Sequence, residues 1–193
     1  MPVDNLSSVL SDVSDLITDG RIGCASAVLR ERYPFVPAMR TGRKCTPRQM
    51  TAVFLRDGFV DRYRGTRLVC PPALRLISHY LPGEFPYHKN GKMDLGHVAY
   101  WELFPTIDHV HPVARGGTDS EDNWVTCSMT TNSIKANWTL EQLGWRLLPP
   151  GKQDEWDGLL NWFVEQVDRD PSLLAESYFK RWIGAARDCR EAR

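Results

Sequence analysis

The pattern of apolar and polar positions predicts helices at both ends of the chain and a short strand-rich centre. Apolar residues recur at helical spacing up to a stop at Gly20. They are Val3, Leu6, Val9, Leu10, Val13, Leu16 and Ile17. A second helix is predicted from Cys24 to Arg32. Thr46-Pro47 has the pattern of an N-cap followed by proline, which predicts a third helix ending near Arg56.

Weaker signals predict the elements that follow. In chain order they are a strand over 66–70, a short helix opened by Pro71-Pro72, a surface loop over 82–95, a capping box over 139–142 and two closing helices, near 154–167 and after Asp170-Pro171. Tryptophans at positions 124, 138, 145, 156 and 162 indicate that the closing helices pack onto the core.

The centre of the chain, from Thr106 to Asn137, has a different pattern. A strand is predicted over 106–111, a turn-rich loop over 115–119, a second strand over 123–127 and a short helix over 128–137. We therefore expect an α+β fold that is mainly helical and surrounds a small hairpin-helix core. The expected organisation is a helical extension over 1–50, a core over 51–140 and packed helices over 141–193.

Composition narrows the class of protein. The chain has 193 residues, a formal net charge of zero, and no apolar run near the roughly 18 residues that a membrane span needs. Five cysteines, none paired as CxxC, argue against a disulfide framework and against a cysteine zinc site. We expect a cytoplasmic protein with no membrane partner.

The centre also carries the candidate chemistry. Asp108 and His109 are adjacent on the first predicted strand, whereas Asn132 and Lys135 share one face of the predicted helix. If that helix packs across the hairpin, Asp108, His109 and Asn132 can converge. Carboxylate and amide oxygens suit Mg²⁺ or Mn²⁺, and a neutral imidazole can activate water.

This segment resembles the HNH, or ββα-metal, nuclease family. The family pattern is D-H-(I/V)-x-P, a G-G turn, D-N, and N-x-x-K. The chain has Asp108-His109-Val110-His111-Pro112, Gly116-Gly117, Asp122-Asn123 and Asn132-Ser133-Ile134-Lys135 in the same order and spacing. The resemblance spans at most residues 52–140 and is specific over 106–137.

The resemblance implies a metal-dependent endonuclease that hydrolyses DNA phosphodiester bonds. His109 would be the general base, and Asp108 and Asn132 would hold one divalent ion that stabilises the leaving 3′ oxygen. Asn123 would orient the histidine or brace the loop, and Lys135 would lie near the substrate phosphate. Restriction, phage or mobile-element roles all fit such an enzyme.

The chain departs from the family where many members bind structural zinc. Arg56-Asp57-Gly58-Phe59 matches the segment before the first cysteine pair, but Asp61 and Arg64 occupy the cysteine positions. The second pair would fall on Ser128 and Thr131. The chain thus resembles a zinc-less bacterial type, whose members carry the phrase FPTIDHVHPVARGG. We expect packing by Phe104, Trp124, Trp138 and the closing helices to replace the metal.

Other basic residues are candidates for nucleic-acid contact. His111 and Arg115 flank the G-G turn. The segment from Arg30 to Arg48 holds six basic residues against one acid, and its candidates are Arg43, Lys44 and Arg48.

Alternatives to a DNA endonuclease remain open. One is an HNH scaffold that binds nucleic acid or protein without cutting, and another is a nonspecific nuclease that also acts on RNA. A single motif cuts one strand, so double-stranded DNA would be nicked one strand at a time unless the protein forms a homodimer or recruits a partner.

Overall fold

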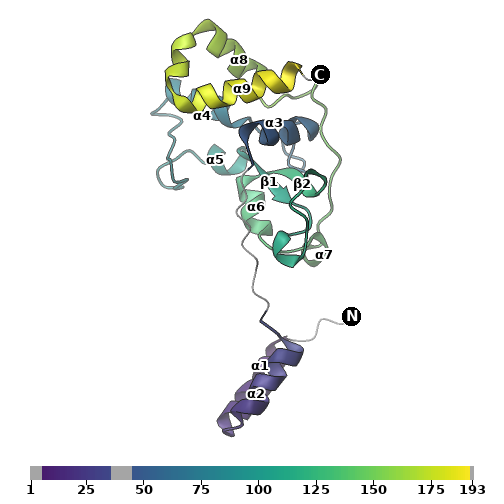
Figure 1. Cartoon of the computed structure of the whole chain (residues 1–193). Helices are drawn as coiled ribbons and strands as arrows, with labels where there is room; N and C mark the ends of the chain where they lie inside the picture. Colours follow the sequence, from purple (N-terminus) through teal and green to yellow (C-terminus); the bar gives the residue numbers. More distant parts are fainter. Residues whose placement is uncertain (1–5, 36–44, 192–193) are drawn as a thin grey trace. The chain divides into compact units, whose positions relative to one another are not determined.

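The computed structural model describes residues 6–35 and 45–191, and it divides the chain into two compact units (Figure 1). The first unit spans Met1–Met39 and the second spans Arg40–Arg193. Among the described residues, no helix is both long enough and apolar enough to cross a membrane.

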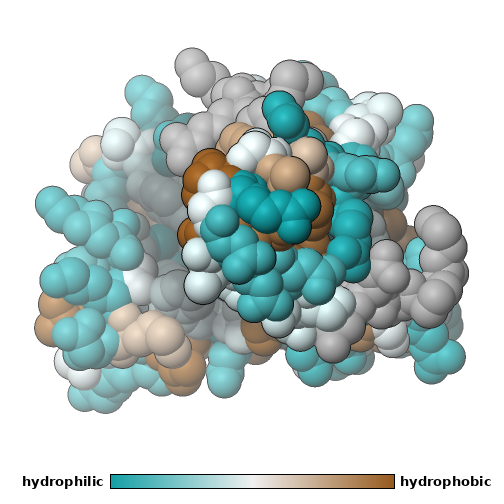
Figure 2. Space-filling model, turned by 90° about the horizontal axis from the view of Figure 1, so that it is seen from below, coloured by the Kyte–Doolittle hydropathy of each residue, from teal (hydrophilic) through white to brown (hydrophobic). Residues whose placement is uncertain are grey.

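The first unit is a pair of helices. Helix α1 spans Leu6–Thr18 and α2 spans Ile22–Arg32, with Gly20 at a positive φ of 73° between them. The predicted helices are confirmed, although α2 begins two residues before the predicted Cys24. Few side chains are buried, namely Val9, Val13 and Ala25. Apolar side chains consequently reach the surface beside polar ones, as the view from below shows (Figure 2).

Four helices build the main core of the second unit. They are α3 (Pro47–Arg56), α4 (Pro71–Tyr80), α8 (Leu160–Arg169) and α9 (Ser177–Glu191). Helix α3 packs on α9, and α4 packs on α8. Phe54, Phe59, Phe163 and Phe179 are fully buried between them. Thr46 caps α3 through the expected side-chain bond, in a capping box with Gln49.

The predicted hairpin and helix lie against this core. Strand β1 (Pro105–His109) pairs antiparallel with β2 (Trp124–Ser128), with Asp108 opposite Val125. Helix α6 (Met129–Lys135) follows directly and ends where Ala136 adopts a positive φ of 45°. The short helices α5 (Ala99–Glu102) and α7 (Leu140–Leu143) flank it, and 3₁₀ turns at Val113–Arg115 and Glu121–Asn123 shape the loop.

Two buried carboxylates attach the segment after α3 to the hairpin. The Asp57 carboxylate accepts a hydrogen bond from the Thr126 backbone N–H at 2.7 Å and pairs with the Arg62 guanidinium at 2.7 Å. The Asp61 carboxylate accepts from the backbone N–H groups of Tyr63, at 2.9 Å, and Ser128, also at 2.9 Å. Both acids are fully buried, so β2 is fixed by hydrogen bonds that no solvent competes for.

This arrangement changes the expected replacement for zinc. Asp61 and Ser128, which occupy predicted cysteine positions, are joined by a direct hydrogen bond. Ser128 then caps α6 through its hydroxyl, which accepts from the backbone N–H of Thr131 at 3.0 Å. Trp124 is buried as expected, but Trp138 is 49% exposed and contributes little packing. The clamp is therefore polar as well as apolar.

Three predicted elements differ from the structure. Residues 66–70 form only an isolated bridge, between Val60 and Arg67, rather than a strand. The helix predicted near 154 begins at Leu160, because Leu159 adopts a positive φ of 62° and the Asp157 carboxylate caps the turn. Asp170-Pro171 opens the 3₁₀ turn Pro171–Ala175, and α9 begins after it.

Replacing Asp61 tests the clamp. Asp61→Ala leaves the buried N–H of Ser128 without its acceptor, so we expect the free energy of unfolding to fall by about 3 kcal/mol. Chemical denaturation measures this change. The control Asp154→Ala removes an exposed acid and should change stability by less than about 0.5 kcal/mol. Equal effects of the two substitutions would contradict the clamp.

Candidate active site

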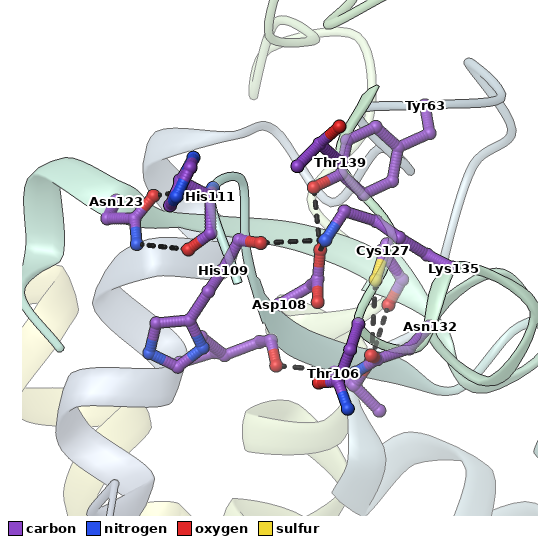
Figure 3. A network of polar contacts seen from close by, with 12 residues as sticks. Tyr63, Thr106, Asp108, His109, His111, Asn123, Cys127, Asn132, Lys135 and Thr139 are labelled. Carbon is purple, nitrogen blue, oxygen red and sulfur yellow. Dashed lines mark hydrogen bonds and ion pairs between the residues drawn. The ribbon is translucent and has the colours of Figure 1, made fainter. Parts of the chain in front are cut away.

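An interior ion pair lies on the face of β1 that α6 covers. Lys135 is fully buried, and its ammonium lies 2.8 Å from the Asp108 carboxylate. The same carboxylate oxygen accepts a hydrogen bond from the Tyr63 hydroxyl at 2.7 Å (Figure 3). Burial, followed by the Asp108 charge, raises the pKa of Tyr63 well above its ordinary value. The hydroxyl therefore stays protonated and donates to Asp108.

Lys135 also ties the helix to the strand. Its ammonium donates to the backbone carbonyl of His109 at 2.8 Å. Both interactions hold the ammonium in the interior, where it neutralises Asp108. A contact with substrate phosphate, as the resemblance implies, would require Lys135 to leave these two partners.

His109 belongs to a second polar group. Its Nε2 lies 2.7 Å from an Asp119 carboxylate oxygen, and the Trp124 indole N–H lies 3.0 Å from that same oxygen. The Trp124 indole N–H also lies 3.0 Å from His109 Nε2, so the imidazole, the Asp119 carboxylate and the indole form one close polar cluster.

The two polar groups point in different directions. Asp108 and His109 are neighbours on one strand, and the imidazole is turned away from the Asp108 carboxylate (Figure 3). Asn132 lies with Asp108 on the α6 side, where its amide nitrogen donates to the Thr106 hydroxyl at 3.0 Å. The structure therefore brings the two predicted metal ligands to one face, and it directs the predicted base elsewhere.

Asn123 braces the loop that leads away from His109. Its amide nitrogen donates to the carbonyls of His111, at 2.8 Å, and Thr118, at 2.7 Å, and its oxygen accepts from the His111 N–H at 2.9 Å. Gly117 has no room for a side chain, since a Cβ there would lie 2.0 Å from the His111 carbonyl oxygen. Asn123 thus supports His109 through the backbone.

The remaining predicted nucleic-acid contacts lie on the surface. His111 and Arg115 are exposed, and each also bonds to backbone: His111 Nε2 to the Arg115 carbonyl, and Arg115 Nε to the Asn137 carbonyl. Arg48 is exposed and pairs at 3.8 Å with Asp188. Arg43 and Lys44 lie outside the described residues.

Two oxygens beside the interior ion pair could take part in a cation site. Within the described parts of the chain, one carboxylate oxygen of Asp108 accepts from Tyr63 and pairs with Lys135, and the amide nitrogen of Asn132 donates, whereas the second oxygen of Asp108 and the amide oxygen of Asn132 make no hydrogen bond. These two oxygens are the ligand type that Mg²⁺ prefers. Residues 6–35 and 45–191 hold no cluster of three His, Cys, Asp or Glu side chains, so water or substrate oxygens would complete the coordination.

The sequence left two members of these groups unassigned. Tyr63 lies 45 residues before Asp108, and no local pattern connects them. Asp119 directly follows Gly116-Gly117-Thr118, where an acid is also ordinary turn chemistry. The only sequence feature that connects Asp119 with His109 is their separation of ten residues across the predicted turn-rich loop.

Replacing Lys135 tests the interior ion pair. Lys135→Met keeps the length of the side chain but leaves Asp108 without its cation, so we expect a loss of about 3–5 kcal/mol in the free energy of unfolding. Adding Asp108→Asn should restore part of that stability, because the uncompensated charge disappears. Strictly additive effects in the double variant would contradict the pairing.

Comparisons with known proteins give no further guide to this site. The chain matches no protein-family model, no curated protein and no solved structure. What the chain does is therefore inferred from its own residues and their geometry.

Proposed function

We propose that this protein is a metal-dependent endonuclease of the HNH type that hydrolyses DNA phosphodiester bonds. The observation that carries the proposal is the placement of the motif. Asp108, His109, Asn123 and Asn132 lie on one strand–loop–strand–helix unit, each held by the polar contacts described above.

The proposed reaction needs a general base, two metal ligands and residues that support them. His109, held by Asp119, removes a proton from a water molecule, which attacks the phosphorus. Asp108 and Asn132 would hold the divalent ion, which would supply charge stabilisation for the phosphate and the departing 3′ oxygen. Asn123 keeps the loop after His109 in place, and Lys135 limits the negative charge of Asp108.

A second candidate function is nucleic-acid binding without cleavage. The observation that favours it is the orientation of His109, which is turned away from the two predicted metal ligands (Figure 3). In this alternative, the ion pair of Asp108 with Lys135 is a structural element of a recognition module.

Plasmid nicking separates the two candidates. We expect the wild-type protein to convert supercoiled plasmid to the open circle with Mg²⁺ or Mn²⁺ but not with EDTA. His109→Ala should abolish nicking, and Asn132→Ala should raise the metal concentration required. His79→Ala, an exposed histidine far along the chain from the motif, is the matched control and should nick normally. Failure of the wild type with every divalent metal would favour the binding module.

Asp119 gives an independent test of how His109 works. If the His109 imidazole acts as the general base in the orientation that the structure shows, Asp119→Asn weakens the hydrogen bond that orients it. We then expect cleavage to slow by about tenfold to a hundredfold. The rate constant under saturating metal measures this effect, and Glu121→Gln, an exposed acid on the same loop but outside the motif, is the control. An unchanged or faster rate would show that the Asp119 contact is not the working one.

A further inference from the structure

An open groove lies beside the Asp108 face of the hairpin. Its volume is about 340 Å³, and its walls are Tyr63, Arg64, Gly144, Trp145, Arg146 and Leu148. Tyr63 connects the groove to the motif, because its ring lines the groove while its hydroxyl donates to Asp108 at 2.7 Å. The groove is therefore next to the predicted metal ligands rather than next to the His109 imidazole.

The groove is basic and aromatic. Arg64 and Arg146 are exposed, and in the described parts of the chain neither guanidinium has an ion-pair partner. The Arg64 guanidinium lies over the Trp145 ring, 5.2 Å from its centroid, and the Tyr63 ring lies 5.8 Å from the same ring. The groove thus combines two arginines that have no ion-pair partner in the described residues with two tilted aromatic rings, one of which lies under the Arg64 guanidinium.

The wall of the groove is held in place by backbone contacts. The Arg62 carbonyl accepts from the Leu148 N–H at 2.7 Å, and the Arg62 guanidinium donates to the Leu148 carbonyl at 2.7 Å. Arg62 in turn pairs with buried Asp57, which also holds β2. One buried network therefore fixes the groove and the hairpin relative to each other.

We propose that this groove binds an unpaired nucleotide of the nucleic-acid strand, with the two arginines on its phosphates and its base against the Trp145 ring. Guanidinium groups recognise phosphate through paired donors, and aromatic rings stack on any base. The volume is at the lower end of the roughly 300–1,000 Å³ typical of ligand sites, which suits one nucleotide better than a duplex. Base faces are accessible only where bases are unpaired. The inference rests on the proposed function and deepens it by assigning a site to an unpaired nucleotide of the strand that is cut.

Binding of a labelled oligothymidine by the full-length protein tests the proposal. We use His109→Ala in EDTA, so that no cleavage occurs, and measure fluorescence anisotropy. Arg64→Ala with Arg146→Ala should weaken binding by about tenfold or more, because two phosphate contacts are lost. Trp145→Leu should weaken binding to oligothymidine but not to an abasic strand of equal length.

The chain supplies a matched control for the arginines. Arg67 is also exposed and lies over a tryptophan, Trp156, at 5.5 Å, but it does not line the groove. Arg67→Ala should change affinity by less than about twofold. Melting curves followed by circular dichroism show whether each variant is folded. The same ranking with an oligouridine would extend the site to RNA.

Several outcomes would overturn the inference. The first is an equal loss of affinity in Arg67→Ala and Arg64→Ala. The second is an equal affinity of the protein for a duplex and for oligothymidine. The third is a loss of affinity in Trp145→Leu that is the same for oligothymidine and for the abasic strand. The proposed function fails separately, through the absence of nicking. Groove-dependent binding without nicking would identify a single-strand binding module, whereas nicking with no dependence on the groove would contradict only this inference.

Discussion

The structure around the motif depends on two buried carboxylates whose partners are backbone N–H groups and an arginine. Asp57 and Asp61 belong to the segment that follows α3, and their carboxylates accept hydrogen bonds from backbone N–H groups of β2. A strand pair of five residues each is too small to be stable alone, so these bonds and the packing of α3 hold the hairpin. A buried carboxylate that accepts several N–H groups is a fixed anchor, because no other partner is available to those donors.

The hairpin separates polar groups that are adjacent in sequence. Strand alternation sends Asp108 towards α6 and Tyr63, and it leaves His109 with Asp119 and Trp124. The α6 side combines the Asp108 carboxylate and the Asn132 amide with a buried ammonium and the neighbouring basic groove. The His109 side holds an imidazole beside the Asp119 carboxylate.

The sequence predicted those parts of the fold whose signals are local. The capping box at Thr46, the glycine stop at Gly20 and the period of α1 each act within a few residues, and the structure has all three elements. The motif likewise predicted the strand, loop, strand and helix of the centre. It did not reveal the bonds from Tyr63 or Asp61, because both residues act on partners more than 40 positions away. Strand alternation predicts that Asp108 and His109 point to opposite faces unless the strand bends, and convergence was possible only if the helix packed across the hairpin; in the structure the His109 imidazole is turned away from the Asp108 carboxylate (Figure 3).

The contact between α3 and α9 determines when the core can fold during translation. Helix α3 carries Phe54 into a core that Phe179 of α9 completes, although nearly the whole second unit separates them along the chain. Contacts of such high sequence separation form late, because a long loop must close first. A ribosome would therefore have translated the entire motif before its supporting core could assemble. Interrupted translation products would therefore carry the hairpin and α6 without the C-terminal helix that completes the supporting core.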